Sequence, residues 1–206
     1  MRRQNKRYEA VVIGGSAGSM DVLLSFLSLL PPQFYFPIVV ICHLHPEDDG
    51  GLVEYFKSQL QIKVVEAREK ERLQNSHIYF PPANYHLLVE RDGSFALSID
   101  KKVNYSRPSI DVFFESAAVC WAEKLIGIIL TGASRDGAEG IRSIKRHGGL
   151  TLAQDPGEAV HPVMPQAAID TGCVDKVFTT IEIGNFLSTI AGRTRKSNQV
   201  LNNNNV

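Results

Sequence analysis

The segment EAVVIGGSAGSMDVLLSFLSLL, residues 9–30, joins a β-branched run, a glycine-rich turn and an amphipathic stretch. Glu9–Ile13 is typical of a buried strand, because its apolar residues are continuous and β-branched. Met20–Leu30 carries leucine and phenylalanine at helical spacing, which predicts a helix. A strand that passes through glycines directly into a helix is the opening unit of an α/β fold.

The alternation of short strands and amphipathic segments continues along the chain. Further strands are predicted at 37–42, 62–65, 78–80, 85–90, 95–99, 125–130, 150–153 and 174–178, and helices at 52–60, 110–123, 138–146 and 181–190. The Asp92-Gly93 pair between two strands indicates a hairpin. We therefore expect an α/β fold: a mostly parallel, doubly wound sheet with helices on both faces and an antiparallel β-hairpin extension.

Length and charge point to one domain with basic ends. The 206 residues contain no Gly/Ser/Pro-rich linker in their middle. Seven of the 22 basic residues lie in 1–8 and 193–206, which leaves 15 basic against 22 acidic residues between them. We expect a disordered basic N-terminus over 1–8, a catalytic domain over 9–192 and a disordered basic, Asn-rich tail over 193–206. The excess of acidic residues between the basic ends argues against nucleic-acid binding.

The cysteines and the hydropathy indicate a cytoplasmic protein. Cys42, Cys120 and Cys173 are too few and too scattered for a disulfide framework or a CxxC metal site. No apolar run approaches the ~20 residues that a membrane-spanning helix requires. Residues 8–16 form a short β-like run followed by glycines, which is not a signal-peptide core.

Polar residues follow three of the predicted strands. Ser16 comes after the first strand, His43 after the second, and Asp136 after the strand at 125–130. The carboxyl ends of parallel strands form the ligand-binding edge of an open α/β sheet. A serine, a histidine and an aspartate at that edge are the nucleophile, the general base and the orienting acid of a hydrolase triad.

Each of these residues has a chemical role in such a triad. The Ser16 hydroxyl is a weak nucleophile until a base removes its proton, and His43 would be that base. Asp136 would hold the second ring N–H of His43 and fix its tautomer. The glycines beside Ser16 permit a sharp turn, and the helix that starts near Ser19 or Met20 would direct N–H groups at an oxyanion.

The same residues allow other interpretations. A glycine-rich turn can cradle a phosphate, although the G-x-G-x-x-G pattern fails at Ser16 and Ser19 and no Walker lysine follows. His43 and His45, two apart on an extended chain, could share a metal ion. Asp136 could simply cap the helix that follows it. The conjunction of the three residues favours a serine hydrolase.

Several further motifs resemble the catalytic domain of the CheB-type chemotaxis protein-glutamate methylesterases, in the same order and over roughly residues 11–190. The matching motifs are Gly14–Ser19, His43, Ile78-Tyr79 with Pro82 and 85–88, Arg107–Asp111, Leu130-Thr131-Gly132, Asp136–Gly140, Gly148-Gly149, Ala153–Asp155 and Met164–Ala168. The resemblance implies that Ser16, His43 and Asp136 are the catalytic triad.

The resemblance also implies the reaction and the partner. Ser16 would attack a γ-glutamyl methyl ester on the methylated cytoplasmic helical domain of a chemoreceptor, and methanol would leave from an acyl-enzyme. Deamidation of receptor glutamines is a second implied activity. No cofactor or metal is needed. We expect a monomer that acts on this protein partner in the cytoplasm, without membrane insertion.

Four positions depart from the family pattern. Ala17, Ser19, Ser106 and Ala133 stand where threonine, glycine, histidine and methionine are usual. Backbone N–H groups survive such changes, so Ala17, Gly18 and Ala133 remain candidates for oxyanion or substrate binding. The family's phosphorylatable receiver domain is not expected in the few residues before the first strand.

Arg107 and the departures leave two questions. Arg107 would bind either a substrate carboxylate or an acidic neighbour. The missing hydroxyl at Ala17 and the missing imidazole at Ser106 motivate an alternative function: a catalytically weak CheB-like binding module that docks on receptor or kinase complexes.

Overall fold

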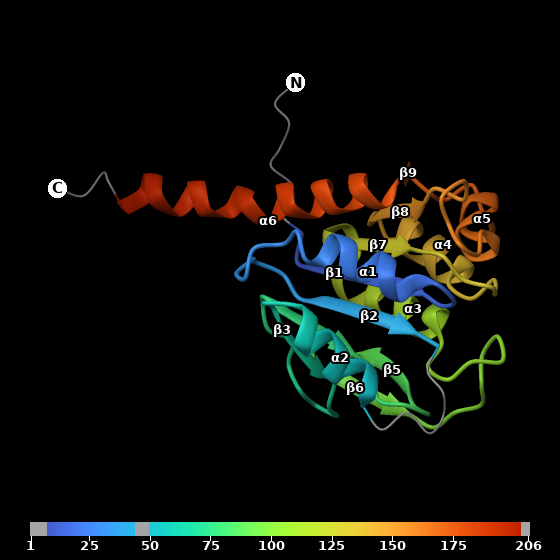
Figure 1. Ribbon diagram of the computed structural model, residues 1–206. Helices are drawn as coiled ribbons and strands as arrows, with labels where there is room; N and C mark the ends of the chain where they lie inside the picture. The colour runs from blue at the N-terminus through green and yellow to red at the C-terminus, as the bar shows by residue number, and fades with distance from the viewer. Residues whose placement is uncertain (1–7, 44–49, 203–206) are drawn as a thin grey trace.

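A seven-stranded sheet in which all neighbouring strands are parallel lies at the centre of the molecule (Figure 1). The computed structural model describes residues 8–43 and 50–202, with side chains up to residue 192. Across the sheet the strands are β3 (Lys63–Glu66), β4 (His77–Phe80), β2 (Ile38–Cys42), β1 (Ala10–Gly15), β7 (Leu125–Ile129), β8 (Leu150–Gln154) and β9 (Lys176–Phe178).

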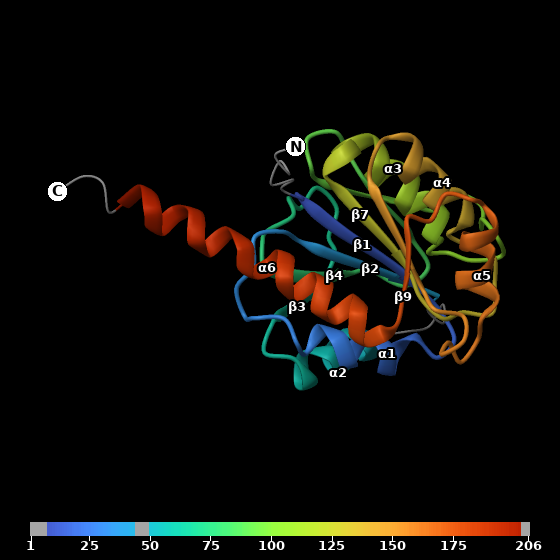
Figure 2. The ribbon, with the colours of Figure 1, turned by 90° about the horizontal axis from the view of Figure 1, so that it is seen from above.

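Helices cover both faces of this sheet (Figure 2). On one face lie α1 (Ser19–Leu27), α2 (Gly51–Gln59) and α6 (Thr180–Asn202). On the other lie α3 (Ile110–Trp121), α4 (Ala138–Arg146), α5 (Val163–Asp170) and the antiparallel pair β5 (His86–Val89) and β6 (Phe95–Ser98). A 3₁₀ turn, Ala122–Lys124, connects α3 to β7. The prediction of a mostly parallel, doubly wound sheet with a β-hairpin is confirmed.

The central strand β1 shows why the predicted strands are continuously apolar. Val11 and Ile13 belong to the core under α1, α2 and α6, whereas Ala10 and Val12 belong to the core under α3, α4 and α5. All four side chains are fully buried. Successive side chains of a strand point to opposite faces, so a strand with helices on both sides needs apolar residues at every position.

Some elements differ from the prediction. Helix α5 was not predicted, because Pro165 interrupts its pattern. Pro165 lies in the first turn, where its missing N–H costs little. The last helix continues beyond residue 190 to Asn202, into the predicted tail. The hairpin β5–β6 forms a separate sheet, and β4 joins the parallel sheet. The domain limits otherwise stay a prediction, with residues 1–7 and 203–206 outside the described part.

No helix in the described part of the chain combines the length and the apolar character needed to cross a membrane.

Candidate active site

Three loops at the carboxyl edge of the sheet carry the predicted triad. Ser16 directly follows β1, His43 directly follows β2, and Asp136 lies between β7 and α4. Since β2, β1 and β7 are neighbours in the sheet, these loops lie next to one another. The strand order reverses between β1 and β7, and the ligand site of an open α/β sheet is found at such a reversal.

The three side chains form one hydrogen-bonded relay. Ser16 Oγ lies 3.1 Å from His43 Nδ1, and His43 Nε2 lies 2.9 Å from Asp136 Oδ2. Asp136 is fully buried, whereas the His43 side chain is 18% exposed. The carboxylate can only accept a hydrogen bond, so it places the proton of the neutral imidazole on Nε2. His43 Nδ1 is then free to take the proton of the Ser16 hydroxyl.

The turn that carries Ser16 is tied to its surroundings by backbone and side-chain hydrogen bonds. The Ser16 N–H donates to the carbonyl of Thr131, 3.0 Å away in the loop after β7. The Ser16 carbonyl accepts from the backbone N–H of Ser19 at 3.0 Å and from its hydroxyl at 2.7 Å. Ser19, one of the departures from the family pattern, therefore holds the nucleophile turn in shape.

Gly18 is required by the geometry of the same turn. Its φ is 78°, in the left-handed region that favours glycine. A Cβ at this position would lie 2.9 Å from the Cβ of Val160, closer than side chains approach. The turn can therefore pass under Val160 and enter α1 at Ser19 only with glycine here.

Three backbone N–H groups in the loops that follow β1 and β7 have no acceptor among the described residues. Within residues 8–43 and 50–192, the N–H groups of Ala17, Gly18 and Ala133 donate to no protein acceptor. Thr131 Oγ1 donates to the Ala17 carbonyl at 3.1 Å, which fixes the orientation of the following peptide. Binding of an oxyanion at these groups stays a prediction.

Asp136 lies at the N-terminus of α3 rather than at that of the following helix. Helix α4 begins after Gly137, and the N–H groups of Gly137 and Gly140 donate to Asp111, not to Asp136. Besides His43, the donors to the carboxylate are Ile110 N at 2.8 Å, Asp111 N at 3.1 Å, Ser109 Oγ at 2.9 Å and Asn104 Nδ2 at 2.9 Å. The carboxylate of Asp136 does accept hydrogen bonds from a helix N-terminus, as the helix-cap interpretation predicted. The helix is α3, however, and not the following helix α4.

These donors keep Asp136 ionised. Burial alone would raise the pKa of this carboxyl group, but hydrogen bonds from His43, Asn104 and the N–H groups of Ile110 and Asp111 hold the pKa below its ordinary value. A buried carboxylate that stays charged stabilises the imidazolium that forms when His43 takes a proton.

Sequence reasoning missed Asn104 and Ser109. A serine directly before a predicted helix is an N-cap signal, which marks Ser109 as a polar helix-start residue but does not predict its partner. In the structure its hydroxyl bonds Asp136 instead of capping α3. Asn104 belongs to a turn with no recognisable motif.

Arg107 holds a neighbouring loop together. Its guanidinium donates to Asn84 Oδ1 at 2.7 and 3.2 Å and to the carbonyls of Ile99 and Asp100 at 2.7 and 3.0 Å. In the described part of the chain Arg107 forms no ion pair, so the acidic neighbour that we considered is absent there. Binding of a substrate carboxylate stays a prediction.

The metal alternative finds no support at His43. Both ring nitrogens already have partners, Ser16 and Asp136. Among the residues that the structure describes, no three His, Cys, Asp or Glu side chains gather closely enough to hold a metal ion. His45, the second ligand of this hypothesis, lies outside the described residues.

The model of the CheB methylesterase family matches residues 11–187. The chain belongs to this family. CheB methylesterases are carboxylic ester hydrolases, and the resemblance seen in the sequence is therefore confirmed.

Individual CheB relatives agree. A Leptospira interrogans protein, provisionally named a protein-glutamate methylesterase/protein-glutamine glutaminase, is 46% identical over 85% of this chain and 91% of its own length. A protein-glutamate methylesterase/protein-glutamine glutaminase of Anaeromyxobacter dehalogenans is 38% identical over 86% of this chain and 52% of its own length. The crystal structure of the Thermotoga maritima CheB methylesterase catalytic domain superposes with a TM-score of 0.85 at 32% identity, covering 89% of this chain and 98% of that domain.

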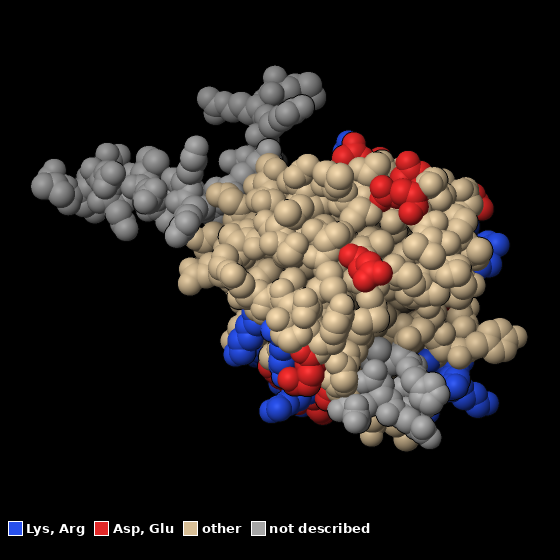
Figure 3. Space-filling view, viewed as in Figure 1, with Lys and Arg blue, Asp and Glu red and all other residues tan. Residues whose placement is uncertain are grey.

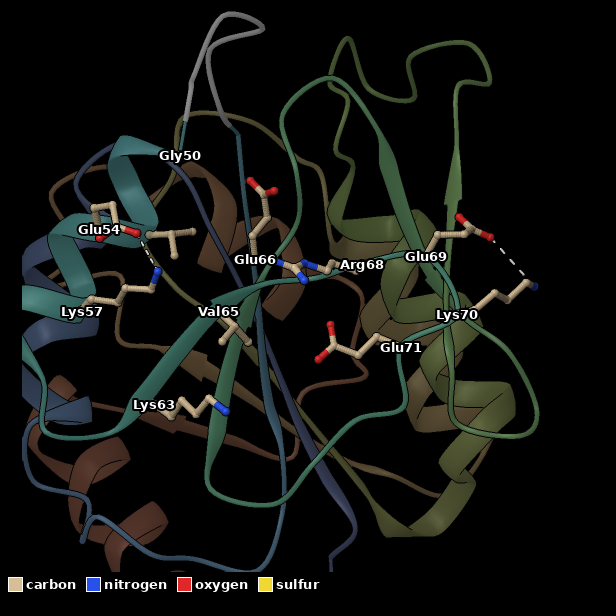
Figure 4. Close-up of a pocket in the computed structure, with 11 residues that line it drawn as sticks. Gly50, Glu54, Lys57, Lys63, Val65, Glu66, Arg68, Glu69, Lys70 and Glu71 are labelled. Atoms are coloured by element: carbon tan, nitrogen blue, oxygen red, sulfur yellow. Dashed lines mark hydrogen bonds and ion pairs between the residues drawn. The ribbon is translucent and has the colours of Figure 1, made fainter.

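A hollow of about 690 Å³ lies away from the triad of this CheB domain, beside α2 and the edge strand β3 (Figure 4). Among the described residues, its lining includes four glutamates and four basic side chains but no serine, cysteine or histidine. Glu54 pairs with Lys57, and Glu69 with Lys70. In Figure 3, charged side chains gather in the lower part of the molecule, where α2 and β3 lie, whereas the surface over α1 carries few. Within the described residues, the hollow therefore lacks the side chains of a Ser-His or Cys-His pair.

Proposed function

We propose that this chain is a serine hydrolase that demethylates glutamate γ-methyl esters on the cytoplasmic signalling domain of chemoreceptors. The observation that carries the proposal is the relay from Ser16 through His43 to Asp136. The names of its relatives support the substrate class, and they extend the proposal to deamidation of protein glutamines. The enzyme acts in the cytoplasm, as a monomer, on this protein partner.

Acylation begins when His43 Nδ1 takes the proton of the Ser16 hydroxyl and Ser16 Oγ attacks the ester carbonyl. The carbonyl oxygen becomes negative and binds the free N–H groups of Ala17 and Ala133. The C–O bond to the methoxy group then breaks, and the His43 imidazolium returns its proton to give methanol. Asp136 stays ionised throughout.

Deacylation repeats these steps with water. His43 Nδ1 removes a proton from water, and the hydroxide attacks the γ-carbonyl of the glutamyl-Ser16 ester. The tetrahedral intermediate collapses, and His43 protonates Ser16 Oγ as it leaves. The product is the glutamate side chain of the receptor. In deamidation the same cycle releases ammonia in place of methanol.

The departures from the family pattern leave this relay intact. Ala17 contributes its backbone N–H, and Ser19 supports the turn of Ser16. The alternative, a binding module without turnover, does not require a buried carboxylate, an imidazole and a hydroxyl in line. The relay therefore favours the enzyme.

Methanol release from a methylated receptor fragment tests the proposal. We expect the native chain to release methanol and Ser16→Ala to lose about 10⁶-fold in rate, as in other triads. Ser25→Ala is the matched control, because Ser25 is exposed on α1 and its hydroxyl donates to the carbonyl of Val22 in the same helix. Equal release by the native chain and Ser16→Ala would refute a Ser16 nucleophile. Activity that survives Ser16→Ala but disappears with chelator would establish metal chemistry instead.

A further inference from the structure

A second buried carboxylate, Asp111, lies directly behind the triad aspartate. Asp111 is 6% exposed, and its Oδ1 accepts from the N–H groups of Gly137 at 2.9 Å and Gly140 at 2.7 Å, at the start of α4. Asp136 precedes α4 and accepts from the first N–H groups of α3, whereas Asp111 belongs to α3 and accepts from α4. Asp136 thus satisfies N–H groups at the start of α3, and Asp111 satisfies N–H groups at the start of α4.

Asn104 joins the two carboxylates. Its Nδ2 lies 2.9 Å from Asp136 Oδ1 and 2.8 Å from Asp111 Oδ2. A primary amide has two N–H donors, so this one group can serve both acceptors. Two neighbouring carboxylates disfavour each other's ionisation, and a donor between them relieves that repulsion.

The charge state of the pair agrees with this geometry. Burial, and then the charge of Asp136, raise the pKa of Asp111 to about 6, against hydrogen bonds from Gly140, Asn104 and Gly137. The pKa of Asp136 is lowered, and Asn104 is one of the donors that lower it. The Asn104 amide lies between the two acids and therefore favours the charged form of both.

The backbone places the Asn104 side chain for this contact. Val103 and Ser106 exchange hydrogen bonds of 3.2 and 2.9 Å across a two-residue turn. The central residues Asn104 and Tyr105 have φ of 51° and 63°. Asparagine tolerates this left-handed conformation better than most residues. Tyr105 is 97% exposed, so neighbouring side chains of one turn have opposite surroundings: one bonds the buried acids and the other faces solvent.

We propose that Asn104 is a positioning residue of the triad, whose amide keeps Asp136 ionised and aligned with His43 by separating it from Asp111. This proposal rests on the proposed function of Ser16. Without the amide, the two acids relieve their repulsion by taking up a proton, which Asp111 can share with Asp136. A carboxylate that accepts such a proton is a weaker acceptor for His43 Nε2, and His43 becomes a weaker base toward Ser16.

Phosphonylation of Ser16 by a fluorophosphonate ester tests the proposal without a protein substrate. We expect Asn104→Gly to lower the maximal phosphonylation rate about 10- to 100-fold, the value of one hydrogen bond to a charged group. The probe concentration that gives half of the maximal rate should not change, because the Asn104 amide donates to Asp111 and Asp136 behind the reacting groups. Glycine suits the left-handed backbone, so the turn should persist.

Tyr105→Gly is the matched control, because it changes the adjacent residue of the same turn at φ 63° and leaves the amide in place. We expect it to phosphonylate within about twofold of the native rate, as a surface change away from the relay. Asn104→Asp keeps the side-chain size but replaces the donor by a third carboxylate. Asn104→Asp should lower the maximal phosphonylation rate at least as much as Asn104→Gly. Thermal unfolding of each variant controls for folding.

The outcomes separate the two proposals. Native-like rates in both Asn104 variants would overturn the role of Asn104, and so would an equal loss in Tyr105→Gly, which would mean that only the turn matters. A change confined to the half-saturating concentration, or loss of the folded state in both Asn104 variants, would also overturn it. A native chain that is not phosphonylated at all would refute the proposed function, and the inference would fall with it.

Discussion

Two polar regions of the molecule contrast in how their charges are held. At the triad edge, Asp136 is fully buried, and His43, Asn104, Ser109 and the first N–H groups of α3 surround its oxygens. In the hollow beside α2 and β3, charges of both signs balance through pairs of exposed side chains such as Glu54 and Lys57. Fixed donors in a buried site orient a reactive group, whereas exposed ion pairs contribute little and rearrange easily.

The largest predicted difference comes from neutralising one carboxylate in each region. Asp136→Asn should lower the rate of methanol release about 10⁴-fold, as in other Ser-His-Asp triads, because the amide favours the wrong tautomer of His43. Glu66→Gln, an exposed carboxylate of the hollow, should leave the rate within about twofold of native.

Thermal unfolding of both variants controls for folding. If Asp136→Asn stays folded and releases methanol at the native rate, Asp136 only caps α3. If Glu66→Gln loses as much as Asp136→Asn, the contrast between the regions is wrong.

A smaller effect distinguishes the two acids within the triad edge. The pKa of Asp111 is raised to about 6 in the folded chain, from an ordinary value of 3.8, chiefly by burial. The folded state therefore binds this proton more tightly than the unfolded state, so its stabilising contribution is complete well below the ordinary pKa of 3.8 and is lost as pH rises through 6.

We expect the free energy of unfolding of the native chain, relative to Asp111→Asn, to fall by about 2 kcal/mol between pH 4 and pH 7, since one pKa unit is worth about 1.4 kcal/mol and the contribution is not yet complete at pH 4. Urea unfolding of both proteins at the two pH values measures this difference. A relative stability that rises over the same range would contradict the assignment, because it would place the raised pKa elsewhere.

The meeting of Ser16, His43 and Asp136 at one edge of the sheet could be predicted because they follow buried strands. A continuous apolar run such as that before Ser16 identifies a parallel strand, and parallel strands deliver their following residues to one edge. His43 and Asp136 were found in the same way. Neither step requires knowledge of how distant segments pack.

The support of the triad could not be predicted, because it depends on such packing. The bonds of Asp136 to Asn104 and Ser109 join residues 32 and 27 apart in the sequence. They exist because α3 and α4 cross with their N-termini side by side, an arrangement that no local pattern encodes. Pro165 shows the opposite failure, since a local helix-breaking signal hid a helix that tertiary packing supports.

The proposed function makes Ser16 the nucleophile, and the location of a covalent adduct tests that proposal most directly. The native chain is treated with a fluorophosphonate ester, digested and mapped by mass spectrometry, with Ser16→Ala treated in parallel. We predict one phosphonyl adduct, on the peptide that contains Ser16, and none on the corresponding peptide of the variant. An adduct confined to another residue, or a native chain that hydrolyses the receptor ester without any modification of Ser16, would contradict this prediction.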